Sequence, residues 1–400
     1  MRKIKAALLA LLVVMSTACS SGENPKNGSS KPKSDNKAES SASEFQSDEA
    51  VMTSETVTED SSEYDKDDLI RDIIAEYAKT SGVEMQQSYY GNGKYMFWTG
   101  ASGYAVLYDM NTGAYKLLPI NTYYCNGSLY SVSDGKTSHE GSYSMYGDLC
   151  LTRYDLNGNV TGTYSIPNMG YTFFVLEDGR VILTTFADSE DAMFVYYVVS
   201  QDMQTSEKLQ PIKTGTSNGK DVYSDVTRIL TVYNNEAYCT TVDNNRYIIN
   251  MTTGDVRLMD KDMGDELFRY KQQGYLRNYV GKYIIQSDDR NGLYNIGTGR
   301  YYNKALYDDE MNYYLQTFVT DKAFYYSRHT DNDRLTLFRY NSNGEDELIY
   351  ESSPGVEGPD TLYCGVNDEY FVLRDDDVIN IINMNTRQKI ELSWDELLGQ

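Results

Sequence analysis

The chain has 400 residues, with 59 acidic and 36 basic side chains and a net charge of −23. Nucleic acid and anionic membrane surfaces are therefore poor partners, because phosphate binding requires positive charge. Tyrosine reaches 38 residues and glycine 30, whereas proline contributes only 7. Because tyrosine and β-branched residues favour strands and glycine supplies turns, we predict a single large all-β domain.

The N-terminus has the features of an export signal. "MRKIK" places basic residues before the apolar run "AALLALLVVM", which is too short to span a bilayer. The following "STACSSG" resembles the signal of bacterial lipoprotein precursors, in which a small residue, here Ala18, precedes an invariant cysteine, here Cys19. The resemblance implies that residues 1–18 are removed and that Cys19 is lipidated on the outer face of the cell membrane. We expect the organism to be a Gram-positive bacterium. Ser16 departs from the family, which usually carries leucine there, and the alternative is an ordinary secretory signal cut near Ala18.

A tether and a helix follow the signal. Residues 19–66 are acidic and rich in serine, a composition that predicts disorder because little apolar surface is available for burial. In residues 67–82 the stretch "DDLIRDIIAEYAKTSG" has apolar residues at helical spacing. We predict an amphipathic helix docked on the main domain, with Asp67 or Asp68 as N-cap and Gly82 as the stop.

One turn recurs seven times within residues 83–400. The copies are "DMNTG" (109–113), "DLNG" (155–158), "DMQTS" (202–206), "NMTTG" (250–254), "NIGTG" (295–299), "NSNG" (341–344) and "NMNTR" (383–387). Their last residues are spaced by 45, 48, 48, 45, 45 and 43 positions. Such a period, with several short strands in each unit, is typical of a β-propeller. We predict a seven-bladed β-propeller whose blades each have four strands, with the recurrent turn between the third and fourth; six or eight blades are the alternatives.

The chemistry of the turns supports this arrangement. The final glycine of "DMNTG" suits the left-handed conformation of a type I turn with a bulge, and Asn157-Gly158 suits a type I′ turn. Ser206 and Arg387 replace that glycine, each at a cost on the order of 1 kcal/mol if the geometry is kept. The repeats resemble the D-x-x-T-G units of YVTN- and quinoprotein-type propellers. That resemblance implies the architecture and carries over no catalytic or quinone-binding residue.

Cysteine and histidine give no metal signature. The even number of cysteines beyond Cys19 permits disulfides, but Cys125 and Cys364 occupy the same position in non-adjacent repeats, so we favour buried free thiols for Cys125, Cys150, Cys239 and Cys364. The two histidines, His139 and His329, lie in predicted loops. We predict no cofactor; calcium is the alternative, because "DLNGN" and "TDNDR" share some residues with calcium loops.

Acidic residues recur in the loop between the second and third strands of six repeats. In a propeller these loops emerge on one face, so we predict an acidic rim that attracts a basic partner or divalent cations. The alternative is a set of ordinary solvated loops, since hairpin loops favour aspartate. The candidate rim consists of Asp134, Asp188, Asp191, Asp243, Asp288, Asp289, Asp331, Asp333, Asp375 and Asp377.

Tyrosine-rich stretches are the second candidate surface. "SYYGNGKY", "FVYYVV" and "FYYS" offer planar rings to sugars or peptides, although tyrosines on strands also pack between blades. There is no HExxH or phosphate-binding loop. We therefore predict a monomeric, surface-anchored, non-catalytic binding or scaffold module for a protein, peptide or cell-wall glycan. The alternative is an extracellular hydrolase or lyase that uses carboxylates near the central channel.

Overall fold

The structure is a computed structural model that describes residues 65–80, 85–86, 88–98, 104–119, 121–133, 149–186, 194–260, 279–285, 293–298, 300–302, 314–329, 335–341, 346–352, 363–375 and 378–398. The chain divides into two units, Met1–Ser61 and Ser62–Gln400, and every described residue belongs to the second. The predicted signal, Cys19 and all but the end of the predicted tether lie outside the described residues. None of the described helices has the length and apolar character needed to cross a bilayer.

The described part of the second unit is mostly β-structure, with seven four-stranded antiparallel sheets. Within each sheet the strands are neighbours in chain order. The first sheet contains β1 (Tyr89–Gly91), β2 (Lys94–Trp98), β3 (Tyr104–Asp109) and β4 (Tyr115–Pro119). The second contains β5 (Tyr123–Cys125), β6 (Ser128–Ser133), β7 (Cys150–Tyr154) and β8 (Val160–Tyr164). The third contains β9 (Met169–Val175), β10 (Val181–Phe186), β11 (Phe194–Val199) and β12 (Ser206–Lys208).

The remaining four sheets repeat this order. The fourth contains β15 (Val226–Tyr233), β16 (Glu236–Thr241), β17 (Arg246–Asn250) and β18 (Val256–Leu258). The fifth contains β19 (Tyr279–Val280), β20 (Tyr283–Ile285), β21 (Leu293–Asn295) and β22 (Arg300–Tyr302). The sixth contains β23 (Tyr314–Val319), β24 (Ala323–His329), β25 (Leu335–Asn341) and β26 (Asp346–Glu351). The seventh contains β27 (Tyr363–Val366), β28 (Tyr370–Asp375), β29 (Val378–Asn383) and β30 (Lys389–Ser393), and the short helix α4 (Trp394–Leu398) follows it.

All seven recurrent turns join the third and fourth strands of a sheet, as predicted. An aspartate or asparagine recurs as the first residue of the turn because its side chain accepts hydrogen bonds from the backbone of the turn. Asp109 Oδ1 accepts from the N–H groups of Asn111 at 2.9 Å and Thr112 at 3.1 Å. Asn250 Oδ1 repeats this pattern and accepts from the N–H groups of Thr252 and Thr253, both at 2.9 Å.

Two copies of the turn differ from their predicted geometry. Arg387 keeps the left-handed conformation with φ 60°, but Ser206 begins β12, and Met203 takes the left-handed position in that turn with φ 59°. The type I′ prediction for Asn157-Gly158 is wrong, because only Gly158 has a positive φ. Its N–H donates to the carbonyl of Asp155 at 2.9 Å, which makes a type I turn closed by a left-handed glycine.

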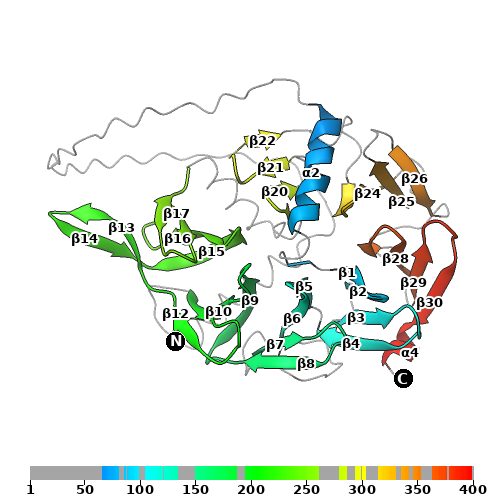
Figure 1. The fold of residues 1–400 in the computed structure, drawn as a ribbon, viewed down its shortest axis with the longest axis horizontal. Coiled ribbons are helices and arrows are strands. Elements are labelled where there is room, and N and C mark those ends of the chain that lie inside the picture. The colour runs from blue at the N-terminus through cyan, green and yellow to red at the C-terminus, as the bar shows by residue number, and fades with distance from the viewer. Residues whose placement is uncertain are drawn as a thin grey trace, which may run out of the picture. The chain divides into compact units, whose positions relative to one another are not determined.

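The sheets follow one another around a common centre (Figure 1). Clusters of buried apolar side chains include residues of six pairs of neighbouring sheets. The seventh sheet consists only of β27–β30, so it meets the first sheet through side chains and shares no strand with it in the described part of the chain. Representative buried pairs join the first and second sheets (Leu107, Leu129), the second and third (Val132, Leu183), the third and fourth (Ile182, Ile249), the fifth and sixth (Leu293, Phe324), the sixth and seventh (Leu337, Phe371), and the seventh and first (Ile379, Phe97).

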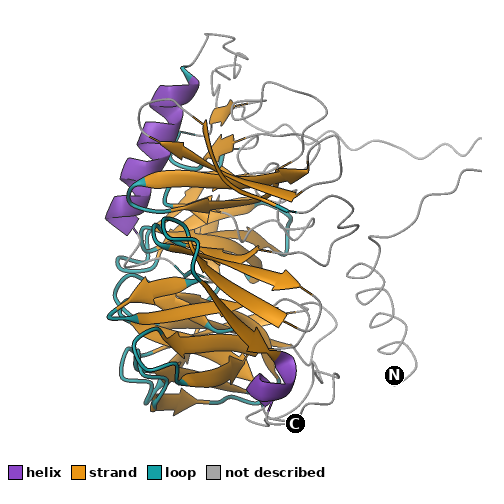
Figure 2. Ribbon diagram, turned by 90° about the vertical axis from the view of Figure 1, so that its right-hand side faces the viewer, coloured by secondary structure: helices purple, strands orange, loops and turns teal. Residues whose placement is uncertain are grey.

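Helix α2 (Lys66–Thr80) lies along one face of the strand layer (Figure 2). It begins one residue earlier than predicted and ends two residues earlier, and its N-cap is Asp65, whose carboxylate accepts the N–H of Asp67 at 2.8 Å. Its apolar side packs against the fifth and sixth sheets, with Ile73 fully buried.

Glu76 of α2 is a buried carboxylate that fastens the helix to two sheets. Its Oε1 accepts a hydrogen bond from the Tyr233 hydroxyl of the fourth sheet at 3.0 Å, and Lys282, in the turn after β19, lies 3.9 Å from Oε2. Gly281 in the same turn leaves room for Glu76, because a Cβ there would lie 2.3 Å from Glu76 Cγ. The helix is thus held by both packing and charge.

A hairpin that sequence analysis missed is inserted between the third and fourth sheets. It consists of β13 (Ile212–Ser217) and β14 (Lys220–Ser224), which pair only with each other (Figure 1). Asn218 and Gly219 form its turn with φ values of 50° and 72°, as a type I′ turn requires. Most of its residues are exposed, so it contributes little to the core.

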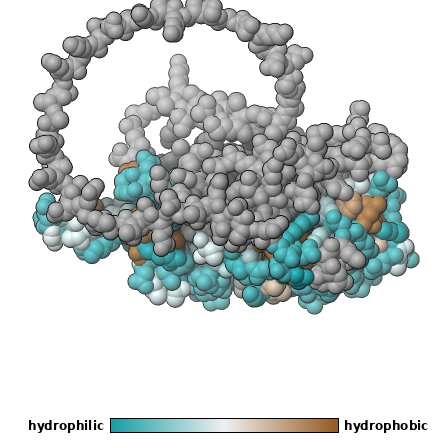
Figure 3. All heavy atoms as spheres, turned by 90° about the horizontal axis from the view of Figure 1, so that it is seen from above, coloured by the Kyte–Doolittle hydropathy of each residue, from teal (hydrophilic) through white to brown (hydrophobic). Residues whose placement is uncertain are grey.

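The described surface is mainly hydrophilic in the view of Figure 3, with small hydrophobic patches. The cysteines described with their side chains are free thiols: Cys125 and Cys239 are buried, and Cys150 is partly buried. Burial raises the pKa of the Cys239 thiol to about 12, so this side chain acts as a small apolar residue of the core. The side chain of Cys364 lies outside the described residues.

Candidate binding cavity

A cavity of about 470 Å³ lies where the C-terminal end of α2 meets β1, β5 and the turns before β24 and β28. In Figure 1, β1 and β5 lie near the common centre of the sheets, below α2. The polar lining of the cavity includes Asp321, Lys322, Asp368 and Glu369. The aromatic lining, from which we call it the tyrosine cavity, consists of Tyr77, Tyr89, Tyr90, Tyr95 and Tyr124.

Two of these tyrosines form a stacked pair across the first and second sheets. The rings of Tyr89 and Tyr124 have centroids 4.2 Å apart and planes 23° apart. Gly91, two residues along the same strand face, makes room for the Tyr89 ring, because a Cβ at Gly91 would lie 2.3 Å from the Tyr89 hydroxyl oxygen. Burial raises the pKa of both tyrosines, so both phenols stay protonated at neutral pH.

Tyr90 connects the first sheet to the seventh. Its ring lies 6.0 Å from that of Tyr95 and 5.8 Å from that of Tyr370, and its hydroxyl donates to Glu369 Oε2 at 3.2 Å. Burial, followed by the negative charge of Glu369, raises the pKa of Tyr90 to about 12. The hydroxyl therefore remains a donor at neutral pH and fixes the orientation of the Glu369 carboxylate.

Asp368 is held by three donors on the sixth sheet and the turn before β24. Its Oδ1 accepts from the Thr320 hydroxyl at 2.6 Å and from the Tyr325 hydroxyl at 3.1 Å, and Lys322 Nζ lies 3.3 Å from Oδ2. The charge of Asp368 raises the pKa of Lys322, so that this largely exposed ammonium keeps its charge. The cavity thus presents fixed carboxylates and one cation beside its aromatic rings.

Helix α2 supplies one wall of the tyrosine cavity. The hydroxyl of Tyr77 donates to Gln86 Oε1 at 3.3 Å. Gln86 in turn forms an antiparallel bridge with Tyr124, with both backbone hydrogen bonds at 2.8 Å. Gln86 is therefore fixed against β5, and its hydrogen bond with Tyr77 holds the end of the helix beside the cavity.

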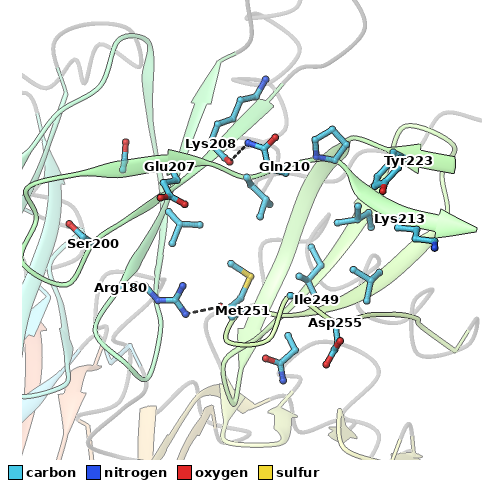
Figure 4. Close-up of a pocket in the computed structure, with 18 of the residues that line it drawn as sticks. Arg180, Ser200, Glu207, Lys208, Gln210, Lys213, Tyr223, Ile249, Met251 and Asp255 are labelled. Carbon is cyan, nitrogen blue, oxygen red and sulfur yellow. Dashed lines mark hydrogen bonds between the residues drawn. The ribbon is translucent and has the colours of Figure 1, made fainter. Parts of the chain in front are cut away.

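A larger cavity of about 750 Å³ lies near the outer strands of the third and fourth sheets (Figure 4). Two of its charged side chains are bound by the protein. Arg180 donates to Asp178 at 2.6 Å and to the Met251 carbonyl at 2.7 Å. Lys213 likewise pairs with Asp221 at 2.7 Å. Tyr223 is its one tyrosine among the described residues and is 60% exposed. Aromatic residues therefore distinguish the two cavities, because the tyrosine cavity is lined by five tyrosines.

The structure describes little of the predicted acidic rim. Asp243 lies in the loop between β16 and β17, as expected, and accepts hydrogen bonds from Ser224 at 3.2 Å, Asn245 at 2.7 Å and Thr241. These bonds lower its pKa, with Thr241 as the largest cause. Asp375 is the last residue of β28, and its side chain is not described. The residues of the rim outside the described part are Asp134, Asp188, Asp191, Asp288, Asp289, Asp331, Asp333 and Asp377.

The described residues include no group of three or more potential metal ligands. His329, expected in a loop, is the last residue of β24, and His139 lies outside the described residues. The acidic residues of the tyrosine cavity escaped prediction because they lie in turns between the first and second strands. The segments "TDKA" and "VNDEY" contain these residues, but in the sequence they have only the features of ordinary hairpin turns.

No protein-family model matches the chain, and no curated protein matches it. Among solved structures it is similar to the β-propeller domain of Swd1 from Myceliophteria thermophila, with 11% identity over 78% of this chain and 98% of that one and a TM-score of 0.35. It is also similar to the β-propeller domain of the Trilobed protease from Pyrococcus furiosus (11% identity, 78% and 93% covered, TM-score 0.33). A third is TolB from Acinetobacter baumannii (13% identity, 74% and 78% covered, TM-score 0.30). With TM-scores this low, these likenesses fix neither a blade number nor a function for this chain.

Proposed function

We propose that residues 83–400 form a seven-bladed β-propeller, each four-stranded sheet being one blade. The seven sheets of the described residues and the apolar contacts of the first sheet with the seventh support this proposal. A blade count by an experimental structure of residues 65–400 tests it, and six or eight blades would contradict it.

The proposed role is that of a non-catalytic binding or scaffold module for a protein, peptide or cell-wall glycan. The tyrosine cavity is the observation that carries this proposal. Its volume of about 470 Å³ falls within the range of ~300–1,000 Å³ typical of ligand sites. Aromatic rings with a few fixed polar groups are also the usual lining of such sites.

The experiment is a crosslinking pull-down from the cell envelope with the displayed protein as bait. The double variant Tyr89→Ala/Tyr124→Ala should lose the captured partner, because both rings of the stack are removed. Tyr223→Ala is the matched control, since that tyrosine is exposed and lies outside the tyrosine cavity. Equal capture by the wild type and the double variant would rule out this cavity as the binding site.

The proposed location is the outer surface of a Gram-positive cell, with a lipid on Cys19. The support is the N-terminal sequence alone, "MRKIKAALLALLVVMSTACSSG". Cys19→Ala should release the protein into the medium, as measured by fractionation and immunoblotting. Unchanged retention in the membrane fraction would remove the lipid anchor from the proposal.

The acidic rim remains a second proposed surface, for a basic partner or divalent cations. Its support is the recurrence of aspartate in corresponding loops of the sequence. Changing Asp288, Asp289, Asp331 and Asp333 to Ser should weaken capture of a basic partner in low salt. Full retention of every partner and ion by this variant would end the rim proposal.

A carboxylate-dependent hydrolase or lyase is the second candidate function. The observation that favours it is the presence of Asp321, Asp368 and Glu369 in the lining of one cavity. Such an enzyme should cleave a bound glycan or peptide, with products detected by mass spectrometry, and Glu369→Gln should abolish the cleavage. A bound ligand that stays intact over prolonged incubation with the wild type would eliminate this candidate.

A further inference from the structure

We propose that the tyrosine cavity binds a pyranose ring of a neutral glycan. This inference rests on the proposed binding function and selects one ligand class for that site. The stacked Tyr89 and Tyr124 rings and the charged groups around them carry it.

The aromatic rings suit the apolar faces of a sugar. The face of an aromatic ring is negatively polarised, so it attracts the weakly positive C–H groups on the flat side of a pyranose. Tyr89 and Tyr124 use one face each for their mutual stack, and both are partly exposed. Since the absence of a Cβ at Gly91 lets the Tyr89 ring lie along its strand, the ring is positioned before any ligand arrives.

The polar lining suits the hydroxyl groups of a sugar. A hydroxyl can donate to a carboxylate and accept from an ammonium group at once, and hydrogen bonds to charged groups are stronger than neutral ones. The cavity offers both partners, since Lys322 lies beside the carboxylates of Asp368 and Asp321 in its lining. Glu369 and Asp368 are fixed by the hydroxyls of Tyr90 and Tyr325, which reduces the entropy lost on binding.

The same charges disfavour an anionic ligand, which would meet three carboxylate side chains, those of Asp321, Asp368 and Glu369. Lys322 offsets only Asp368, at 3.3 Å, so the lining keeps an excess of negative charge that would attract a cationic peptide. The aromatic stack, which suits the flat face of a sugar, therefore selects the glycan, and a cationic peptide serves as the competing ligand in the test.

The test uses the protein of residues 19–400 on an array of neutral and N-acetylated oligosaccharides, followed by calorimetric titration with the strongest binder. Tyr89→Ala should weaken binding by roughly tenfold or more, since removal of a stacking ring from a site costs about that much. The affinity of Tyr89→Phe should stay within about threefold of the wild-type value, because this variant keeps the aromatic ring that carries the interaction. Tyr223→Ala, outside the cavity, should bind as the wild type does.

Three results would overturn the inference. The first is an array on which the wild type retains no oligosaccharide beyond the Tyr89→Ala variant. The second is equal affinity of Tyr89→Ala and wild type. The third is that the protein binds a decalysine peptide and no sugar, and that this binding is lost in 0.5 M NaCl, because added salt screens the charges. If the pull-down still depends on Tyr89 and Tyr124 in any of these cases, the binding function stands and only the glycan class is wrong.

Discussion

Replacing Ile73 by alanine tests whether α2 is part of the folded domain. The Ile73 side chain is 0% exposed and packs in the cluster that also contains Val280 of β19 and Phe324 of β24. Removing a buried isoleucine side chain costs about 2–5 kcal/mol, because apolar burial is lost and a cavity is left. Ile73→Val should cost only about 0.5–1.5 kcal/mol. Arg71 lies on the exposed side of the same helix, so Arg71→Ala should change stability by no more than about 0.5 kcal/mol.

Two measurements separate loss of global stability from local undocking of the helix. Urea denaturation followed by circular dichroism reports the free energy of unfolding of the whole domain. Hydrogen exchange of the α2 amides reports local opening of the helix. If the helix detaches before the sheets unfold, the substitution lowers the protection of these amides more than it lowers the global free energy of unfolding. Ile73→Ala should lower the denaturation midpoint or the α2 protection well beyond the effect of Arg71→Ala. Indistinguishable behaviour of these two variants in both assays would refute the docking of α2.

Three further outcomes are expected. The pKa of Asp109 is lowered from 3.8 to about 2, chiefly by the hydrogen bond from Lys94 and next by that from the backbone N–H of Asn111. The ionised carboxylate of Asp109 therefore stabilises the fold above pH 3.8, and this contribution is lost as the pH falls toward 2. Denaturation midpoints of wild type and Asp109→Asn should therefore differ at pH 7 and converge near pH 2, and a constant difference would contradict this. Cys239 should react with a thiol reagent only after denaturation, and rapid labelling of the native protein at this residue, mapped by mass spectrometry, would show that the thiol is exposed. Gly281→Ala should lower the melting temperature, since the added Cβ would lie 2.3 Å from a carbon of Glu76, and an unchanged melting temperature would mean that the turn and the helix are not in contact.

The sequence predicted the repeating unit well because the unit is encoded locally. In the turns that the structure describes, the side chain of the first residue accepts hydrogen bonds from the backbone of its own turn, as in Asp109 and Asn250, and no distant contact is needed. The same local rule fails where tertiary packing intervenes. Met203 takes over the left-handed position in one turn, and its side chain is buried in the cluster between the second and third sheets.

Two features escaped prediction for different physical reasons. The β13–β14 hairpin carries the strong signal Asn218-Gly219, but its strands lack apolar alternation because neither face is buried. The tyrosine cavity is invisible in sequence because its walls come from segments far apart in the chain, such as Tyr77, Tyr124 and Asp368. Period and turn chemistry specify each sheet, whereas the cavity depends on how α2 and several sheets meet.

Helix α2 contributes to the wall of the tyrosine cavity, and under the proposed binding function this position has a thermodynamic consequence. Tyr77 near its C-terminal end lines the tyrosine cavity and donates to Gln86, which bridges to Tyr124 of the stacked pair. A ligand that contacts this wall binds the docked helix better than the detached one, so binding and docking stabilise each other by the same free energy. Glu76 strengthens the link, because detaching the helix would break its hydrogen bond with the Tyr233 hydroxyl. Under the proposed binding function, substitutions that weaken the docking of the helix should therefore also lower the affinity of the cavity for its ligand.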